Sequence, residues 1–115
     1  MAISEAYAVS ETVSTTEWSL TTDSAGPDAD TNDGVYQCFL DLNALLKADI
    51  FEFKVYEKVQ SASTQRVVFS VRFANAQSEP NWVSPSLILM HGWDMTLKKI
   101  AGTDRAIDTS IRKVA

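Results

Sequence analysis

Alternation of apolar and polar side chains is strongest in residues 49–74, where it predicts a long β-hairpin. In the first arm Phe51, Phe53 and Val55 fall on one face, and charged side chains fall on the other. The matching apolar series of the second arm is Val67, Phe69, Val71 and Phe73. Successive residues of a strand point to opposite faces, so these large apolar side chains share one side. A two-stranded ribbon is marginal in water, and further strands or another copy of the chain must cover this side.

Shorter stretches on both sides of the hairpin also favour extended structure. The further strands that we expect lie within residues 2–13, 14–22, 35–40, 86–90, 93–100 and 105–114. β-branched and aromatic side chains pack well on a half-buried pleated surface, and residues 14–22 are rich in Thr and contain Trp18. Residues 42–47 are too few for an average helix, and we expect at most one short helical connection there.

Two long loops separate these predicted strands, at residues 23–34 and 75–85. Both contain proline and other turn-forming residues, and their length favours crossovers between sheets over a simple meander. We therefore predict an all-β fold, an antiparallel β-sandwich of jelly-roll or other Greek-key type, with at most one short helix near residues 42–47. We divide the chain into an N-terminal arm or edge strand, residues 1–13, and a β-sandwich domain, residues 14–115.

The composition fits one globular domain without a nucleic-acid or membrane partner. The chain has 115 residues, of which 45% are hydrophobic and 22% are charged, and this is enough for a single core. Its net charge is -5 and its longest basic run is Lys98–Lys99, whereas a duplex-binding surface needs a basic stripe. The longest apolar run, residues 87–90, is far too short for a membrane span. The first residues lack the pattern of a signal peptide, so we expect a soluble protein.

In the acidic loop of residues 23–34, Asp28, Asp30 and Asn32 stand at alternate positions, as ligands do in a calcium loop. The helix-loop-helix calcium site needs a glycine at its sixth position and a bidentate glutamate at its twelfth. Asp33 and Phe39 occupy those two positions here. We interpret the loop as an exposed acidic turn, with a weak cation site of other geometry as the alternative.

No residue pattern in this sequence indicates catalysis. His91 is the only histidine, and its neighbours include one carboxylate, Asp94, and no nucleophile, so we interpret it as a structural residue at a strand turn. Cys38 is the only cysteine; it excludes a disulfide within this sequence, and we interpret it as a small buried hydrophobe. There is no glycine-rich phosphate loop and no Cys/His metal spacing. We predict no enzyme, no catalytic residue, no metal and no cofactor.

Aromatic residues supply the candidate interaction sites. Tryptophan is enriched both in cores and at subunit contacts, and Trp82, between two prolines, is the tryptophan that we expect to be most exposed. The N-terminal segment is a candidate for strand addition to a neighbouring protein. The interaction residues selected on these grounds are Trp82, Trp18, Tyr7 and Val9.

Four blocks of the sequence resemble short proteins encoded among the virion structural genes of tailed bacteriophages, several of them from marine hosts. The blocks are DGVYQCFLDLNALL, FEFKVYEKV, SPSLILMHGWDMTLKKIAGTDRAI and SIRKVA. The resemblance extends over residues 14–115 and lies in general sequence texture, not in a functional motif. It implies a capsid decoration or cement protein that is made in the host bacterial cytoplasm and binds and stabilises the phage head shell. The implied partners are the major capsid protein or other virion proteins, together with further copies of the chain, and a trimer is favoured.

Two other functions fit the same residues. The chain is also compatible with a tail, neck or head-fibre component, which differs from a decoration protein in its position in the particle. From a different class, a carbohydrate-binding β-sandwich module would use the tryptophans, Trp82 first, to stack on sugars.

Overall fold

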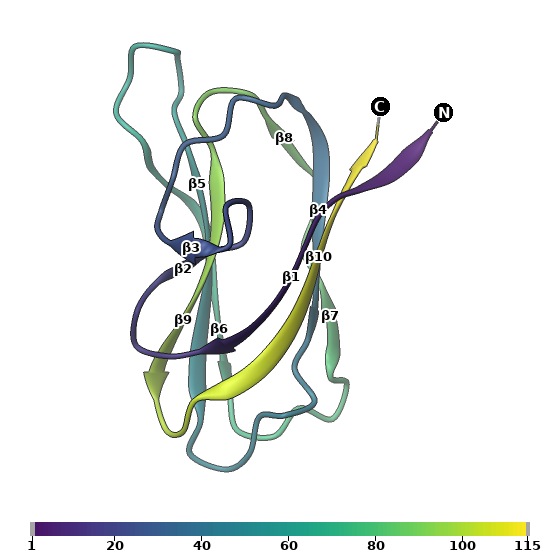
Figure 1. Ribbon diagram of the computed structural model, residues 1–115, viewed down its shortest axis with the longest axis vertical. Helices are drawn as coiled ribbons and strands as arrows, with labels where there is room; N and C mark the ends of the chain where they lie inside the picture. Colours follow the sequence, from purple (N-terminus) through teal and green to yellow (C-terminus); the bar gives the residue numbers. More distant parts are fainter. Residues whose placement is uncertain (1, 115) are drawn as a thin grey trace.

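The computed structural model describes residues 2–114, which form two antiparallel β-sheets (Figure 1). The strands are β1 (Ile3–Val13), β2 (Trp18–Ser19), β3 (Ser24–Ala25), β4 (Gly34–Asp41), β5 (Ile50–Glu57), β6 (Arg66–Ala74), β7 (Asn81–Val83), β8 (Leu87–Leu89), β9 (Asp94–Ala101) and β10 (Arg105–Val114). One sheet has the order β1-β10-β4-β7, with β8 also paired to β4, and we call it the terminal sheet. The other has the order β3-β2-β9-β5-β6, and we call it the hairpin sheet.

The two sheets pack face to face (Figure 1), and the side chains between them form one hydrophobic core. The largest fully buried side chains are Trp93, Tyr36, Phe51, Phe53, Leu20, Leu40, Leu42, Leu45, Leu89, Met95, Leu97 and Ile107. They come from both sheets and from the loops between them, so the apolar face predicted in the sequence finds its cover inside the same chain. The predicted all-β sandwich is confirmed. No helix able to span a membrane occurs within residues 2–114.

The central hairpin forms as predicted, as strands β5 and β6. Phe51, Phe53 and Val55 of its first arm are fully buried. The second arm departs from the prediction at Val67, which is 45% exposed. A bulge opposite Val55 and Tyr56 interrupts the alternation there, and β6 is an edge strand with no neighbour on its outer side. The predicted inner face of β6 therefore holds over residues 69–73 and is wrong at Val67.

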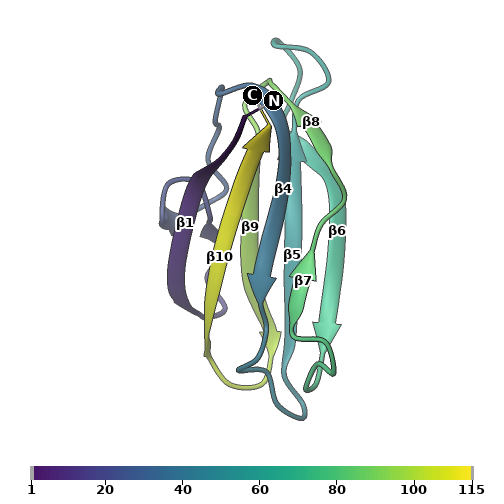
Figure 2. The same ribbon diagram turned by 90° about the vertical axis from the view of Figure 1, so that its right-hand side faces the viewer.

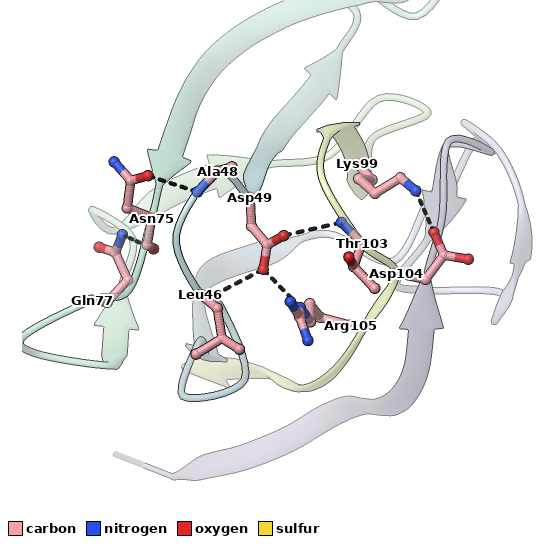
Figure 3. Close-up of polar contacts among 9 residues, drawn as sticks. All are labelled: Leu46, Ala48, Asp49, Asn75, Gln77, Lys99, Thr103, Asp104 and Arg105. Atoms are coloured by element: carbon pink, nitrogen blue, oxygen red, sulfur yellow. Dashed lines mark hydrogen bonds and ion pairs between the residues drawn. The ribbon is translucent and has the colours of Figure 1, made fainter.

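Residues 42–49 form turns, and no helical turn is present in this segment. Backbone bonds join Leu45 N to Leu42 O and Asp49 N to Leu46 O, both at 3.1 Å. A helix nucleus is costly in so short a segment, and a competing set of bonds is available. The Asp49 carboxylate accepts the backbone N–H of Leu46 at 2.8 Å and of Thr103 at 3.0 Å, and the guanidinium Nε of Arg105 at 2.7 Å (Figure 3). This carboxylate thereby ties the loop before β5 to the turn between β9 and β10.

The first strand is an integral edge of the terminal sheet. β1 pairs with β10 from Ile3 opposite Val114 to Val13 opposite Arg105, with one bulge between Glu5 and Tyr7. The two strands lie side by side in both views, so the first and last strands of the chain meet in one sheet (Figures 1 and 2). Because β1 also contributes two buried valines to the core, residues 3–13 belong structurally to the sandwich.

Candidate functional site

The outer face of the terminal sheet carries a row of four apolar side chains. Ile3 lies opposite Val114, Val114 opposite Val35, and Val35 opposite Ile88, so the row crosses β1, β10, β4 and β8. Their chain neighbours Tyr36 and Leu89 point inward and are buried, which places the row on the solvent side. Ile3 is 70% exposed and Ile88 is 81% exposed. We call these four residues the apolar row.

A small hollow of about 170 Å³ is lined in part by three members of the apolar row. Its lining comprises Ile3, Val35, Tyr36, Gln37, Phe39, Ser86, Arg112 and Val114. The guanidinium carbon of Arg112 lies 3.7 Å from the centroid of the Phe39 ring, which is a cation–π contact. Val83 of β7 lies opposite Phe39 and extends the apolar surface to the far edge of the sheet.

A polar row crosses the same face. It lies six residues from the apolar row along β10, which is about 20 Å at the usual rise per residue of a β-strand. Ser10, Asp108, Asp41 and Asn81 lie opposite one another in that order. Asp108 and Asp41 form a directly opposed pair of like charges, an arrangement that costs stability. Within residues 2–114 no three Asp, Glu, His or Cys side chains are grouped so as to hold a metal ion. The outer face is therefore apolar at one end and acidic at the other.

A second polar centre, around Asp94 of β9, is buried under the loop of residues 19–30. Oδ1 of Asp94 accepts the hydroxyls of Ser19 at 3.0 Å and Thr21 at 2.8 Å, and Oδ2 accepts the backbone N–H of Asp28 at 2.7 Å. Burial raises the pKa of Asp94, and the hydrogen bonds that it accepts oppose that rise. Both oxygens of this carboxylate accept hydrogen bonds from residues 19–30. The carboxylate therefore holds that segment in place and presents no free oxygen to a cleft.

The loop of residues 23–34 is less exposed than the sequence suggested. Backbone bonds pair Asp30 with Trp93, the Tyr7 hydroxyl donates to the Asp30 carboxylate, and Ser24 lies in strand β3. The expectation of an exposed turn is right for Asp28 and wrong for Asp30, which is half-buried. These hydrogen bonds hold this part of the loop against the start of β9. A pattern of hydrophobic residues gives no information about such polar contacts.

The four residues selected from the sequence do not converge on one surface. The Tyr7 ring packs edge-on against Trp93 with ring centroids 6.2 Å apart, and Val9 is buried in the core. Trp18 lies on the hairpin sheet, where its indole N–H donates to Asp23 at 2.9 Å. Trp82 lies on the terminal sheet and points toward the core. The structure thus brings Tyr7 next to Trp93 and keeps Trp18 and Trp82 on different sheets.

Trp82 is half-buried in an aromatic cluster between β7 of the terminal sheet and β5 and β6 of the hairpin sheet. Its ring centroid lies 5.3 Å from that of Phe53, 5.1 Å from that of Phe73 and 6.5 Å from that of Phe69. These are ordinary packing distances for aromatic pairs. Trp82 therefore joins β7 to β5 and β6 across the two layers.

The backbone of His91 and the side chain of Cys38 have structural roles in the fold. The backbone N–H of His91 donates to Glu57 Oε1 at 2.9 Å, and its carbonyl accepts the N–H of Lys58 at 3.1 Å, so this residue fastens the turn before β9 to the end of β5. Cys38 is fully buried between the sheets, as predicted, and burial raises the pKa of its thiol. The thiolate form is correspondingly disfavoured.

The apolar row was missed in the sequence because its members belong to four strands. A local signal existed in residues 35–40, where Val35 and Phe39 are apolar although the buried series is Tyr36, Cys38 and Leu40. A strand that is apolar on both faces is covered on both, or presents one face to a partner.

Comparisons with known proteins support the fold. No family model matches the chain, and no curated protein matches it. A solved structure described as "Bacillus endospore appendages form a novel family of disulfide-linked pili" superposes with a TM-score of 0.51 over 98% of this chain and 87% of that chain. Sequence identity is 11%, so the likeness concerns the fold alone: a two-sheet β-sandwich that spans the whole of the described chain.

Proposed function

We propose that this chain is a non-enzymatic structural protein, a decoration or cement protein that binds and stabilises a phage head shell. The observation that carries the proposal is the apolar row, because Ile3 and Ile88 hold large apolar side chains in water on an otherwise well-packed sheet. Contiguous apolar surface of this kind marks sites of protein contact. The partner that we propose is the major capsid protein or another virion protein.

Several groups that catalysis could use make structural contacts instead, and this supports a role through contact. The carboxylates of Asp49 and Asp94 are each occupied by several hydrogen bonds. Cys38 is enclosed in the core. The aromatic ring of Trp82, the residue on which a sugar-binding role would depend, is packed among three phenylalanines.

The fold neighbour is described as a protein of pili, and by analogy this supports an assembled, structural role. Those pili are described as disulfide-linked, whereas this chain has one cysteine, Cys38, which is buried. We therefore propose that its contacts with partners rest on packing and on charge, without covalent cross-links.

The experiment is quantitative mass spectrometry of purified particles, combined with a binding assay. A copy number comparable with that of the shell subunit supports decoration, and a copy number that matches a single ring assigns the chain to the neck or tail. Absence from the particle contradicts the proposal.

A matched pair of variants tests the apolar row itself. Ile88→Ser removes an exposed side chain of the row, and Val59→Ser removes one that is 86% exposed in the loop projecting between β5 and β6 (Figure 1). Burying a side chain of this size contributes about 1.5–3 kcal/mol, which is roughly 10- to 100-fold in affinity. We expect Ile88→Ser to weaken binding to empty shells by this factor and Val59→Ser to leave it unchanged. Equal binding by wild type and Ile88→Ser would show that the row is not the contact.

A further inference from the structure

The sandwich has two long open strand edges. The other edge strands, β3, β7 and β8, have two or three residues each, and prolines lie close to them at Pro27, Pro80 and Pro85. Short strands and nearby prolines are features that prevent edge pairing with other chains. β1 has 11 residues and β6 has nine, and neither contains proline. These two strands therefore present the longest rows of unpaired backbone groups.

The two long edges face away from each other. β1 ends the terminal sheet and β6 ends the hairpin sheet, and Figure 2 places them at opposite sides of the molecule. A contact between β1 of one copy and β6 of another is heterologous, because different surfaces meet. Repetition of such a contact gives a ring if the rotation closes and a filament if it does not.

The two edges also carry opposite charge. β1 contains Glu5 and Glu11 and no Lys or Arg, whereas β6 contains Arg66 and Arg72 and no Asp or Glu. Glu5, Arg66 and Arg72 are exposed, and Glu11 is half-buried. Pairing β1 with β1 brings two acidic strands together, and pairing β6 with β6 brings two basic strands together. Only the mixed pair places opposite charges across the strands, where they stabilise the sheet.

The spacing of the charges agrees between the two strands. Glu5 and Glu11 are six residues apart, and so are Arg66 and Arg72. In an antiparallel pair the register that sets Glu5 opposite Arg72 therefore sets Glu11 opposite Arg66. Both ion pairs form in a single register.

The faces agree as well, because each strand has a bulge between its two charges. Ala6 is the extra residue of β1 and Val68 that of β6. A spacing of six keeps two side chains on one face of a regular strand, and one extra residue moves the second to the other face. Since the two bulges do not coincide, the hydrogen bonds would form two short ladders separated by an irregular middle.

We propose that the β1 edge of one copy pairs with the β6 edge of a second copy, and that copies assemble head to tail through this contact. The proposal goes beyond the particle contact proposed above, because it concerns contacts between copies and does not use Ile88. Closure after three copies gives the trimer that the resemblance implies, and an open rotation gives a filament.

The test is sedimentation velocity of the full chain over a concentration series at low and high salt. We expect concentration-dependent association that weakens as the Debye length shrinks from about 10 Å at 0.1 M salt to about 3 Å at 1 M. The charge reversals Glu5→Lys with Glu11→Lys, and separately Arg66→Glu with Arg72→Glu, replace two attractive cross-strand pairs with two repulsive ones and should each weaken association about tenfold or more. The chain with all four reversals should associate again, because its edges are complementary once more.

Net charge separates this effect from general repulsion. Each Glu→Lys exchange adds two positive charges, so the β1 variant has a net charge of -1 in place of -5 and repels itself less than the wild type. A loss of association in that variant therefore runs against the effect of net charge. Glu79→Lys, in the exposed loop before β7, is the control and should associate as the wild type does.

Several outcomes overturn the proposal. One is a wild-type protein that stays monomeric at every concentration. Another is association that neither double reversal changes. If circular dichroism shows that a reversed variant is unfolded, Glu5→Gln with Glu11→Gln replaces it, and association equal to that of the wild type is then the contrary result. Ile88→Ser should retain self-association even where it loses shell binding, so the two proposals fail separately.

Discussion

Asp94→Ala provides the sharpest test of how the loop of residues 19–30 is held. In the folded protein the Asp94 carboxylate is fully buried, and no ion pair to it occurs within residues 2–114. Its oxygens accept four hydrogen bonds, from the Ser19 and Thr21 hydroxyls and from the backbone N–H groups of Asp28 and Met95, the last at 2.8 Å. Removal of the carboxylate leaves all four donors without this acceptor.

The size of the expected loss in the free energy of unfolding depends on the donors that water cannot reach. Ser19 and Met95 are both fully buried, whereas Thr21 and Asp28 lie closer to the surface. A buried donor left unsatisfied costs about 1–3 kcal/mol, so we expect Asp94→Ala to lower the free energy of unfolding by about 2–6 kcal/mol. This is a large share of the roughly 5–15 kcal/mol that stabilises a typical domain.

Urea denaturation followed by tryptophan fluorescence measures the loss, because Trp93 is adjacent in the chain and buried. Asp28→Ala is the matched control, since the Asp28 side chain accepts one exposed hydrogen bond, from the Thr22 hydroxyl at 2.9 Å, and its loss should cost less than about 1 kcal/mol. Asp94→Asn preserves size but turns an amide N–H₂ toward at least one donor, so an intermediate loss is expected. If Asp94→Ala is no less stable than Asp28→Ala, the carboxylate does not anchor the loop.

Three further predictions concern the other buried groups. Hydrogen bonds from Thr103 and Arg105 lower the pKa of Asp49 to about 2, so its contribution to stability is present above pH 4 and is lost as pH falls toward 2. In urea titrations across this range, the free energy of unfolding of Asp49→Asn should depend less on pH than that of the wild type, and an equal dependence would contradict the assignment. Cys38 should react with a thiol reagent only at the rate of unfolding, and rapid labelling of the native protein would show that the sheets open locally. Trp82→Ala should lower the free energy of unfolding by about 3 kcal/mol through loss of its aromatic contacts, and a loss of sugar binding without destabilisation would favour the carbohydrate module instead.

The proposed shell contact and the proposed contact between copies use different surfaces of the domain, the apolar row and the charged edges. The row lies on the outer face of the terminal sheet, where a partner surface can bury it. The edges formed by β1 and β6 lie at the two sides, so pairing between copies leaves most of that face open. If the row binds a shell and the edges link copies, as proposed above, each contact would raise the effective concentration for the next.

The sequence alone was sufficient for the fold class and for the inner face of the central hairpin. Phe51, Phe53 and Val55 are buried as their alternation predicted, because a period of two assigns each side chain to a face without reference to its neighbours. The same reasoning identified Cys38 as a buried residue of a strand.

Only the tertiary structure decided which strands are neighbours, and most of the proposed function depends on that. The apolar row joins Ile3 to Val114 and Val35 to Ile88, pairs that are distant in sequence, and alternation records the side on which a residue falls but not the strand that lies beside it. Likewise Val67 is exposed because the bulge in β6 turns it to the outer face, and Asp94 is buried because a distant segment covers it and supplies its donors. Strand order arises from long-range packing of the whole chain, and a local pattern therefore contains no record of it.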